Sequence, residues 1–74
     1  MTHKIAHWCS KGARWEAVLE RNDNGFRLSE RKHGHEVGAA YRPLTYFLGR
    51  DDFAKTYFQK YVVQSFDVEM KRVA

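Results

Sequence analysis

The sequence predicts a small α+β protein in which an antiparallel meander of three strands, extendable to four or five, is covered by one helix in the C-terminal half. Two turn signals separate three stretches of alternating polarity between Trp15 and Arg42, and an apolar stripe with helical spacing follows Asp51. At 74 residues, the chain has room for one hydrophobic core and not for two. We therefore expect a single domain spanning residues 1–74.

The first turn is the run Asn-Asp-Asn-Gly at 22–25, whose residue types tolerate a positive φ or bond their own backbone. With these four residues as the loop, Leu19 faces Leu28 on one side of the sheet, and Glu16 faces Arg31 on the other. A two-residue loop would place apolar side chains opposite charged ones, so that neither the apolar pair nor the pair of opposite charge would form. The four-residue loop therefore sets the predicted register of the first hairpin.

The second turn is predicted at His33 and Gly34, a pair suited to a two-residue hairpin loop. This turn produces three cross-strand pairs: Phe26 with Tyr41, Leu28 with Ala39, and Arg31 with Glu36. Two of the pairs are apolar and the third is of opposite charge, so the turn and the pairing agree.

The two faces of this meander differ in composition. One face is apolar, must be covered by the rest of the chain, and is predicted to hold Trp15, Ala17, Leu19, Phe26, Leu28, Val37, Ala39 and Tyr41. The opposite face carries most of the charged residues of the strands, together with Ser29, Gly38 and Ala40, and is expected to be solvated. Glu30 is a charged residue whose phase places it on the apolar face, so we expect it near the rim.

The cover is predicted to be a helix that begins after Gly49 and Arg50, with Asp51 as its N-cap. Its apolar stripe consists of Phe53, Ala54, Tyr57, Phe58, Tyr61 and Val62. The preceding residues 43–49 start with a proline and end with a glycine, which indicates a single helical turn or a packed loop.

Both ends of the chain have patterns that permit further strands. From Phe66 onward apolar and charged residues alternate, which favours a final strand; a helix that continues to the end is the alternative. The N-terminal run from His3 to Cys9 is predicted to form another short strand at an edge of the sheet.

Few chemical signatures are present. Cys9 is the single cysteine, which excludes an internal disulfide, and no apolar stretch of signal or membrane-spanning length follows the start of the chain. A reducing cytoplasm without membrane contact is the expected location.

The four histidines and the cysteine are the candidate metal ligands and catalytic groups of the chain. His3, His7, His33, His35 and Cys9 include no pair with the spacing that places two ligands on one metal. The segments that carry them are an edge and a hairpin tip, which lack the walls that shield an active site. We therefore expect no metal, no cofactor, no small-molecule substrate and no enzymatic activity.

The net charge of +4 invites a nucleic-acid interpretation, since clustered cations attract phosphate. In the middle of the solvated face Arg27 is opposed by Glu20, and Arg31 is flanked by Glu16 and Glu36, so this region is expected to be near neutral. The remaining positive charge forms a predicted basic rim: Lys11, Arg14, Lys32, His33, His35, Arg42, Lys55 and Lys60.

Most aromatic residues belong to the predicted core, whereas Trp8, Tyr46 and Phe47 lie in segments that could present them at the surface. Exposed aromatic side chains beside a basic rim suit binding to a protein or to nucleotide bases. The predicted binding residues are Lys11, Arg14, Lys32, His33, His35 and Arg42, together with Trp8 and Tyr46.

Two function classes remain after these exclusions. The first is a non-catalytic protein that acts on nucleic acid, or on a complex that handles it, through the sheet face and the basic rim. At the level of fold alone, three strands and one helix resemble the arm-type DNA-binding domains of phage and transposon integrases, with no shared motif. The second class is a phage or mobile-element inhibitor or adaptor, such as an anti-CRISPR protein, that blocks a larger host protein without touching nucleic acid. The oligomeric state stays open.

Overall fold

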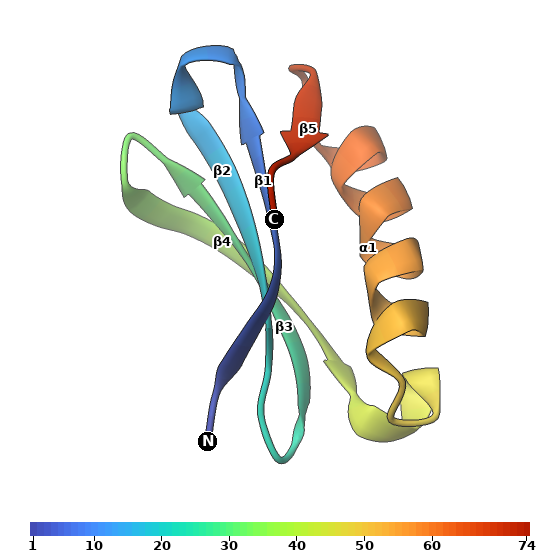
Figure 1. Ribbon diagram of the computed structural model, residues 1–74. Coiled ribbons are helices and arrows are strands. Elements are labelled where there is room, and N and C mark those ends of the chain that lie inside the picture. The colour runs from blue at the N-terminus through green and yellow to red at the C-terminus, as the bar shows by residue number, and fades with distance from the viewer.

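The computed structural model describes residues 1–74 as a five-stranded antiparallel sheet with one helix packed against it (Figure 1). The strand order across the sheet is β4-β3-β2-β1-β5. The strands are β1 (His3–Ser10), β2 (Trp15–Arg21), β3 (Gly25–Lys32), β4 (His35–Pro43) and β5 (Met70–Arg72), and the helix is α1 (Asp51–Ser65). Two short 3₁₀ helices, η1 (Lys11–Ala13) and η2 (Leu44–Phe47), connect them. The predicted α+β fold is confirmed, and none of the helices has the length and apolarity needed to cross a membrane.

The first hairpin has the predicted register. Leu19 lies opposite Leu28, and Glu16 lies opposite Arg31. In the turn, the Asn22 side-chain oxygen accepts hydrogen bonds from the backbone amides of Asn24 at 2.8 Å and Gly25 at 3.0 Å. This is the local side-chain-to-backbone bonding that makes asparagine a turn residue.

The second hairpin is partly as predicted. His33 and Gly34 form the turn with φ values of 53° and 79°, and Arg31 does lie opposite Glu36. The ladder is then interrupted between Glu30 and Arg31, where Val37 is an extra residue on β4. This β-bulge shifts all later pairs by one position.

The shifted register is Phe26 opposite Arg42 and Leu28 opposite Ala40, so the predicted pairs with Tyr41 and Ala39 are wrong. The face assignment of β4 changes with them, because a shift of one residue exchanges the two faces of a strand. Ala40 is buried at 9% exposure, whereas Val37 at 58% and Tyr41 at 49% are exposed.

Gly38 and Arg42 also join Ala40 on the inner face, the one that α1 covers. At Gly38 a side chain would be crowded, since a Cβ atom there would lie 3.0 Å from Glu30 Oε2. On the outer face Ser29 is fully buried, although that face was expected to be solvated. Its hydroxyl donates a hydrogen bond to the Val18 carbonyl oxygen at 3.4 Å.

The core lies between the inner face and α1. It comprises Ala6, Trp8, Ala17, Leu19, Phe26, Leu28, Ala40, Phe47, Ala54, Phe58, Val62 and Met70. Trp8 is fully buried, and its indole N–H donates to Gln59 Oε1 at 2.7 Å, so the prediction that Trp8 could reach the surface is wrong. Phe47, the second uncommitted aromatic residue, is also buried.

The predicted apolar stripe does face the sheet through Ala54, Phe58 and Val62, although Phe53 is 41% exposed. The helix starts one residue earlier than predicted, because Arg50 is the N-cap and Asp51 is already helical. The Asp51 carboxylate instead accepts a hydrogen bond from Arg21 Nη1 at 2.7 Å. Before the helix, η2 is the predicted single turn, and Leu48 and Gly49 follow it with φ values of 53° and 68°.

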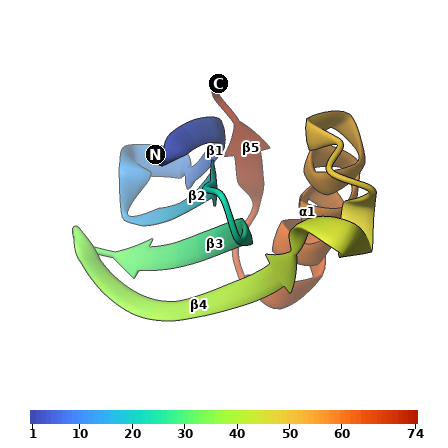
Figure 2. The same cartoon turned by 90° about the horizontal axis from the view of Figure 1, so that it is seen from below.

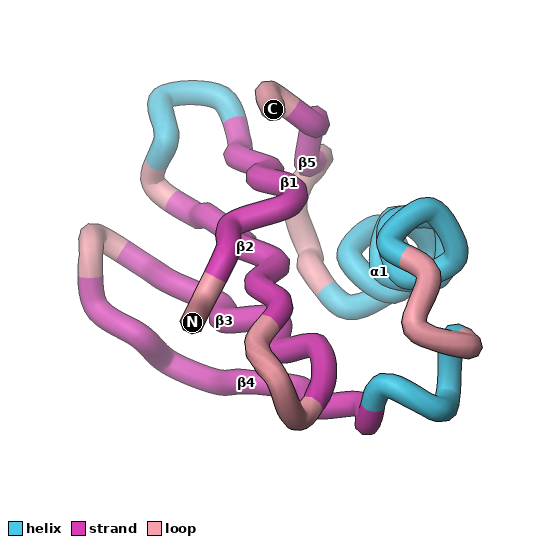
Figure 3. Tube along the Cα trace, turned by 60° about the horizontal axis from the view of Figure 1, so that its bottom comes forward, coloured by secondary structure: helices cyan, strands magenta, loops and turns pink.

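The first and last strands of the chain, β1 and β5, lie side by side in the sheet (Figure 3). The predicted final strand exists as β5, but it begins at Met70 and not at Phe66. The ring of Phe66 packs edge-on against Trp15, with ring centroids 5.8 Å apart. Because β5 pairs with the residues from Trp8 to Ser10, the end of β1 is internal and the predicted edge position is wrong for it. The edges of the sheet are β5 and β4, and β4 runs along the outside of the molecule (Figure 2).

Candidate nucleic-acid interface

Two connections meet at one end of the sheet, where η1 joins β1 to β2 and the second turn joins β3 to β4 (Figure 1). The His33 amide donates to the Arg14 carbonyl oxygen at 2.9 Å, which ties the two connections together. Beside this bond Trp15 is the cross-strand partner of Lys32. The fold therefore brings together residues that are about twenty positions apart in the sequence.

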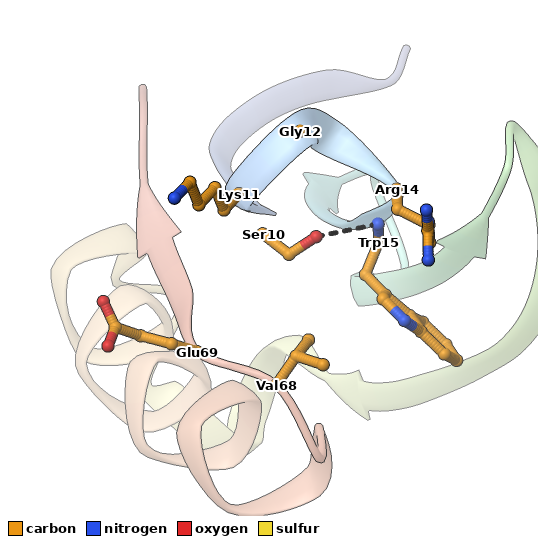
Figure 4. A pocket seen from close by; sticks show the side chains of 7 residues that line it. All are labelled: Ser10, Lys11, Gly12, Arg14, Trp15, Val68 and Glu69. Carbon is orange, nitrogen blue, oxygen red and sulfur yellow. Dashed lines mark hydrogen bonds between the residues drawn. The ribbon is translucent and has the colours of Figure 1, made fainter.

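The first connection is tight, with positive φ values at Gly12 (79°) and Ala13 (54°). Ser10 Oγ accepts a hydrogen bond from the Trp15 amide at 3.0 Å across the base of the turn (Figure 4). Lys11 and Arg14 extend to opposite sides of this turn (Figure 4). A compact, bonded turn holds the two cationic side chains apart from one another.

Lys32 is positioned by an aromatic ring. Its Nζ lies 4.9 Å from the centroid of the Trp15 ring, within the range of a cation–π contact. The Trp15 ring in turn rests on Phe66. The Trp15 ring thus positions the Lys32 ammonium group, while the Lys32 side chain stays exposed.

Arg31 belongs to the same end of the sheet and was expected to be neutralised by Glu16 and Glu36. Both carboxylates bond elsewhere: Glu36 accepts from Arg27 Nη2 at 2.8 Å, and Glu16 Oε2 lies 2.9 Å from His7 Nε2. No carboxylate lies within 4.0 Å of the Arg31 guanidinium. Arg31 thus lies directly opposite Glu16 and Glu36 in the ladder, as predicted, but forms an ion pair with neither.

We call the exposed cationic group at this end the basic turn cluster: Lys11, Arg14, Arg31 and Lys32, with His33 and His35 at its margin. The first four form no ion pair with any carboxylate of the chain. Sequence reasoning identified all members except Arg31. The signal that could have revealed Arg31 is competition for its two carboxylates, because His7 and Arg27 lie on the same face and bond them instead.

A surface pocket of about 410 Å³ opens beside this cluster (Figure 4). Its lining residues are Ser10, Lys11, Gly12, Arg14, Trp15, Val68 and Glu69. Glu69 is its one acidic residue, and that carboxylate is well exposed and 3.8 Å from Lys71 Nζ. A neighbouring pocket of about 570 Å³ shares Ser10, Lys11 and Glu69 with the first. The surface next to the cluster is thus hollowed and lined by more cations than anions.

Arg42 was predicted to belong to the same basic rim, and the structure places it at the opposite end of β4, beside η2 and α1. Its guanidinium donates to Tyr57 Oη at 2.9 and 3.2 Å and to the Tyr41 carbonyl oxygen at 2.7 Å. The hydrogen bond to Tyr57 raises the pKa of Arg42 above its ordinary value. Tyr46 packs edge-on against Tyr57 with ring centroids 5.5 Å apart and is 55% exposed. We call Arg42, Tyr46 and Tyr57 the arginine–tyrosine cluster.

The remaining predicted residues lie apart from both groups. Trp8 is in the core, and Lys55 and Lys60 are on α1. No group of three or more His, Cys, Asp or Glu side chains is placed to hold a metal ion. Cys9 is a free thiol.

Comparison of this chain with protein-family models, with curated proteins and with solved structures found no match.

Proposed function

We propose that this chain is a non-catalytic protein that binds nucleic acid by contacts between the basic turn cluster and the sugar–phosphate backbone. The observation that carries the proposal is the set of four exposed cations without ion-pair partners, held at one end of the sheet by two bonded turns. A cation that no carboxylate holds is available to neutralise a phosphate, and each phosphate neutralised releases counterions condensed on the nucleic acid.

A duplex suits this end of the molecule better than a single strand. Proteins that bind single strands combine a basic groove with aromatic rings on which the bases stack. Here the nearest ring, Trp15, is half-buried between Lys32 and Phe66. Phosphate contacts fix position without reading sequence, so the proposed binding is weakly sequence-specific.

The test is a titration of the purified protein with a fluorescent DNA duplex at several salt concentrations. In the test variant Lys11, Arg14, Arg31 and Lys32 are all replaced by Gln. We expect weaker binding and a salt slope of log affinity that is smaller by about 0.9 for each phosphate that the variant no longer neutralises.

The matched control replaces Lys55 and Lys60 on α1 by Gln, and it should bind almost as the natural protein does. Absence of binding to duplex DNA or RNA at micromolar protein in low salt contradicts the proposal. So does a control variant that loses as much affinity per charge removed as the test variant.

One observation favours a second candidate, in which the chain is an inhibitor or adaptor that binds a larger protein. Arg42 and the exposed Tyr46 lie next to one another at the other end of the sheet. Tyrosine and arginine are enriched among the residues that dominate binding energy at protein interfaces. In this case Tyr46→Ala abolishes capture of the partner from a nuclease-treated lysate, whereas the four-fold Gln variant retains it.

A further inference from the structure

The two edges of the sheet differ in how they are protected. The β5 edge has three residues and carries Lys71 and Arg72, and short, charged strands are a common defence against unwanted pairing. The β4 edge has nine residues and no lysine, and its central residues Val37, Ala39 and Tyr41 are exposed. Figure 2 shows no element alongside this edge. Glu36, Arg42, Pro43 and the bulge at Val37 lie toward the two ends of β4, so the uncovered segment around Ala39 is the part that presents a template for another strand.

The backbone groups that face outward on β4 follow from the hydrogen bonds of its neighbour. The Gly25 carbonyl accepts from the Asn22 amide, so Gly25 is bonded toward β2, and its partner Pro43 turns its backbone carbonyl away from β3. In an antiparallel ladder the bonded and non-bonded pairs alternate. The N–H and C=O groups of Tyr41 and Ala39 therefore point outward. Consistent with this, the Tyr41 carbonyl accepts from the Arg42 side chain.

We propose that β4 pairs antiparallel with β4 of a second copy of this chain, about a two-fold axis at Ala39, so that the two sheets become one. This register places the N–H and C=O of Ala39 against those of Ala39 in the second copy. It sets Val37 opposite Tyr41, an aromatic and β-branched pair of the kind that stabilises sheets.

The strand is thus complementary to itself, which is why a second copy is the occupant that fits. Small residues meet where the strands approach most closely, because Gly38 lies opposite Ala40 of the other copy. A register centred on Ala40 would instead set Val37 opposite Pro43, and proline has no N–H to donate. With the axis at Ala39, each outward-facing backbone N–H of the central residues therefore meets a carbonyl group of the other copy.

The dimer has a consequence for the residues predicted from the sequence. In one copy the basic turn cluster and the arginine–tyrosine cluster lie at opposite ends of β4. Antiparallel pairing about Ala39 brings the turn end of β4 in one copy to the Pro43 end of β4 in the other, so the basic turn cluster of one copy adjoins Arg42 and Tyr46 of the other. Two equivalent composite surfaces result. The dimer itself does not depend on the proposed function.

The test measures the mass of the full chain by sedimentation and by light scattering over a concentration series, in high salt without nucleic acid. We expect a reversible, concentration-dependent dimer. Ala39→Lys places two like charges directly opposite each other, so this variant should lose the dimer, as should Ala39→Glu. Because Ala39 is exposed, both variants should fold, which circular dichroism checks. Val63→Lys, which adds the same charge at an exposed position of α1, is the control and should dimerise normally.

The deciding measurement mixes the two monomeric variants. An equimolar mixture of Ala39→Lys and Ala39→Glu should recover the dimer, because opposite charges then face each other across the axis. A natural protein that stays monomeric throughout the series overturns the proposal. So does a dimer that persists in the Ala39→Lys variant, or a mixture that stays monomeric. None of these outcomes bears on phosphate binding, so failure of the dimer and failure of the proposed function are distinguishable.

Discussion

Arg27, and not Arg31, holds the carboxylate of Glu36. Its Nη2 lies 2.8 Å from Glu36 Oε2, although the residue directly opposite Glu36 in the ladder is Arg31. The bond is diagonal across the outer face and occurs where the extra residue Val37 interrupts the regular pairing. As a result one arginine of β3 is neutralised and the other is left exposed at the basic turn cluster. The bulge thus changes the electrostatics of the surface as well as the register.

This pairing predicts how Glu36 titrates. The hydrogen bond from Arg27 lowers the pKa of Glu36, to which the charge of Arg31 adds a smaller effect. A lowered pKa in the folded state means that the interaction stabilises the fold above the pKa of the unfolded chain and disappears as the pH falls through the folded value. In an NMR titration Arg27→Gln should return Glu36 close to an ordinary glutamate, whereas Arg31→Gln should change it little. The reverse order of the two effects would contradict the observed pairing.

A second prediction tests which residues of β3 face the core. Leu28 is fully buried on the inner face, so Leu28→Ala should lower the free energy of unfolding by about 2 to 4 kcal/mol. Leu48→Ala is the control, because it deletes the same atoms from a side chain that is 77% exposed. Urea denaturation measures both. Equal costs for the two leucines would mean that the assigned inner face is not the core.

A third prediction tests the bond between Trp8 and Gln59. Trp8→Phe removes the indole N–H and leaves the Gln59 amide oxygen without its partner, at a cost of about 1 to 3 kcal/mol in addition to the loss of volume. Trp8→Phe combined with Gln59→Met should cost less than the sum of the single changes, since both polar groups are then gone. Additive costs would show that the bond contributes nothing to the stability of the fold.

Local patterns were sufficient for much of the fold. Asparagine and glycine at 22–25 and the pairing of Leu19 with Leu28 determine the first hairpin, because turn chemistry and cross-strand pairing act over short distances. The alternation after Phe66 likewise anticipated β5. These features depend on neighbours in sequence, or on neighbours joined by a short turn.

The errors arose where distant segments decide the outcome. Nothing in the sequence around Val37 marks a bulge, and its effect appears only when β4 must pair with β3 over its full length. Trp8 is buried because β5 and α1 return to cover β1, with Gln59 supplying the acceptor. Arg42 was grouped with the turn cations on charge alone. Its place beside Tyr57 requires the shifted register that the bulge creates.

The last prediction compares Arg31 with Arg27, two arginines of β3, and tests whether Arg31 contacts a phosphate as the proposed function requires. Arg31 has no ion-pair partner, whereas Arg27 is bonded to Glu36. Under the proposed binding, Arg31→Gln should lower the slope of log affinity against log salt by about 0.9, because one phosphate is no longer neutralised by the protein. Arg27→Gln combined with Glu36→Gln removes the bonded pair together and leaves no freed carboxylate opposite Arg31, so the slope should stay the same or nearly so. Duplex titrations at several salt concentrations supply both slopes. An unchanged slope for Arg31→Gln, or equal changes for the two variants, would mean that the free cations of the turn end do not bind the phosphates.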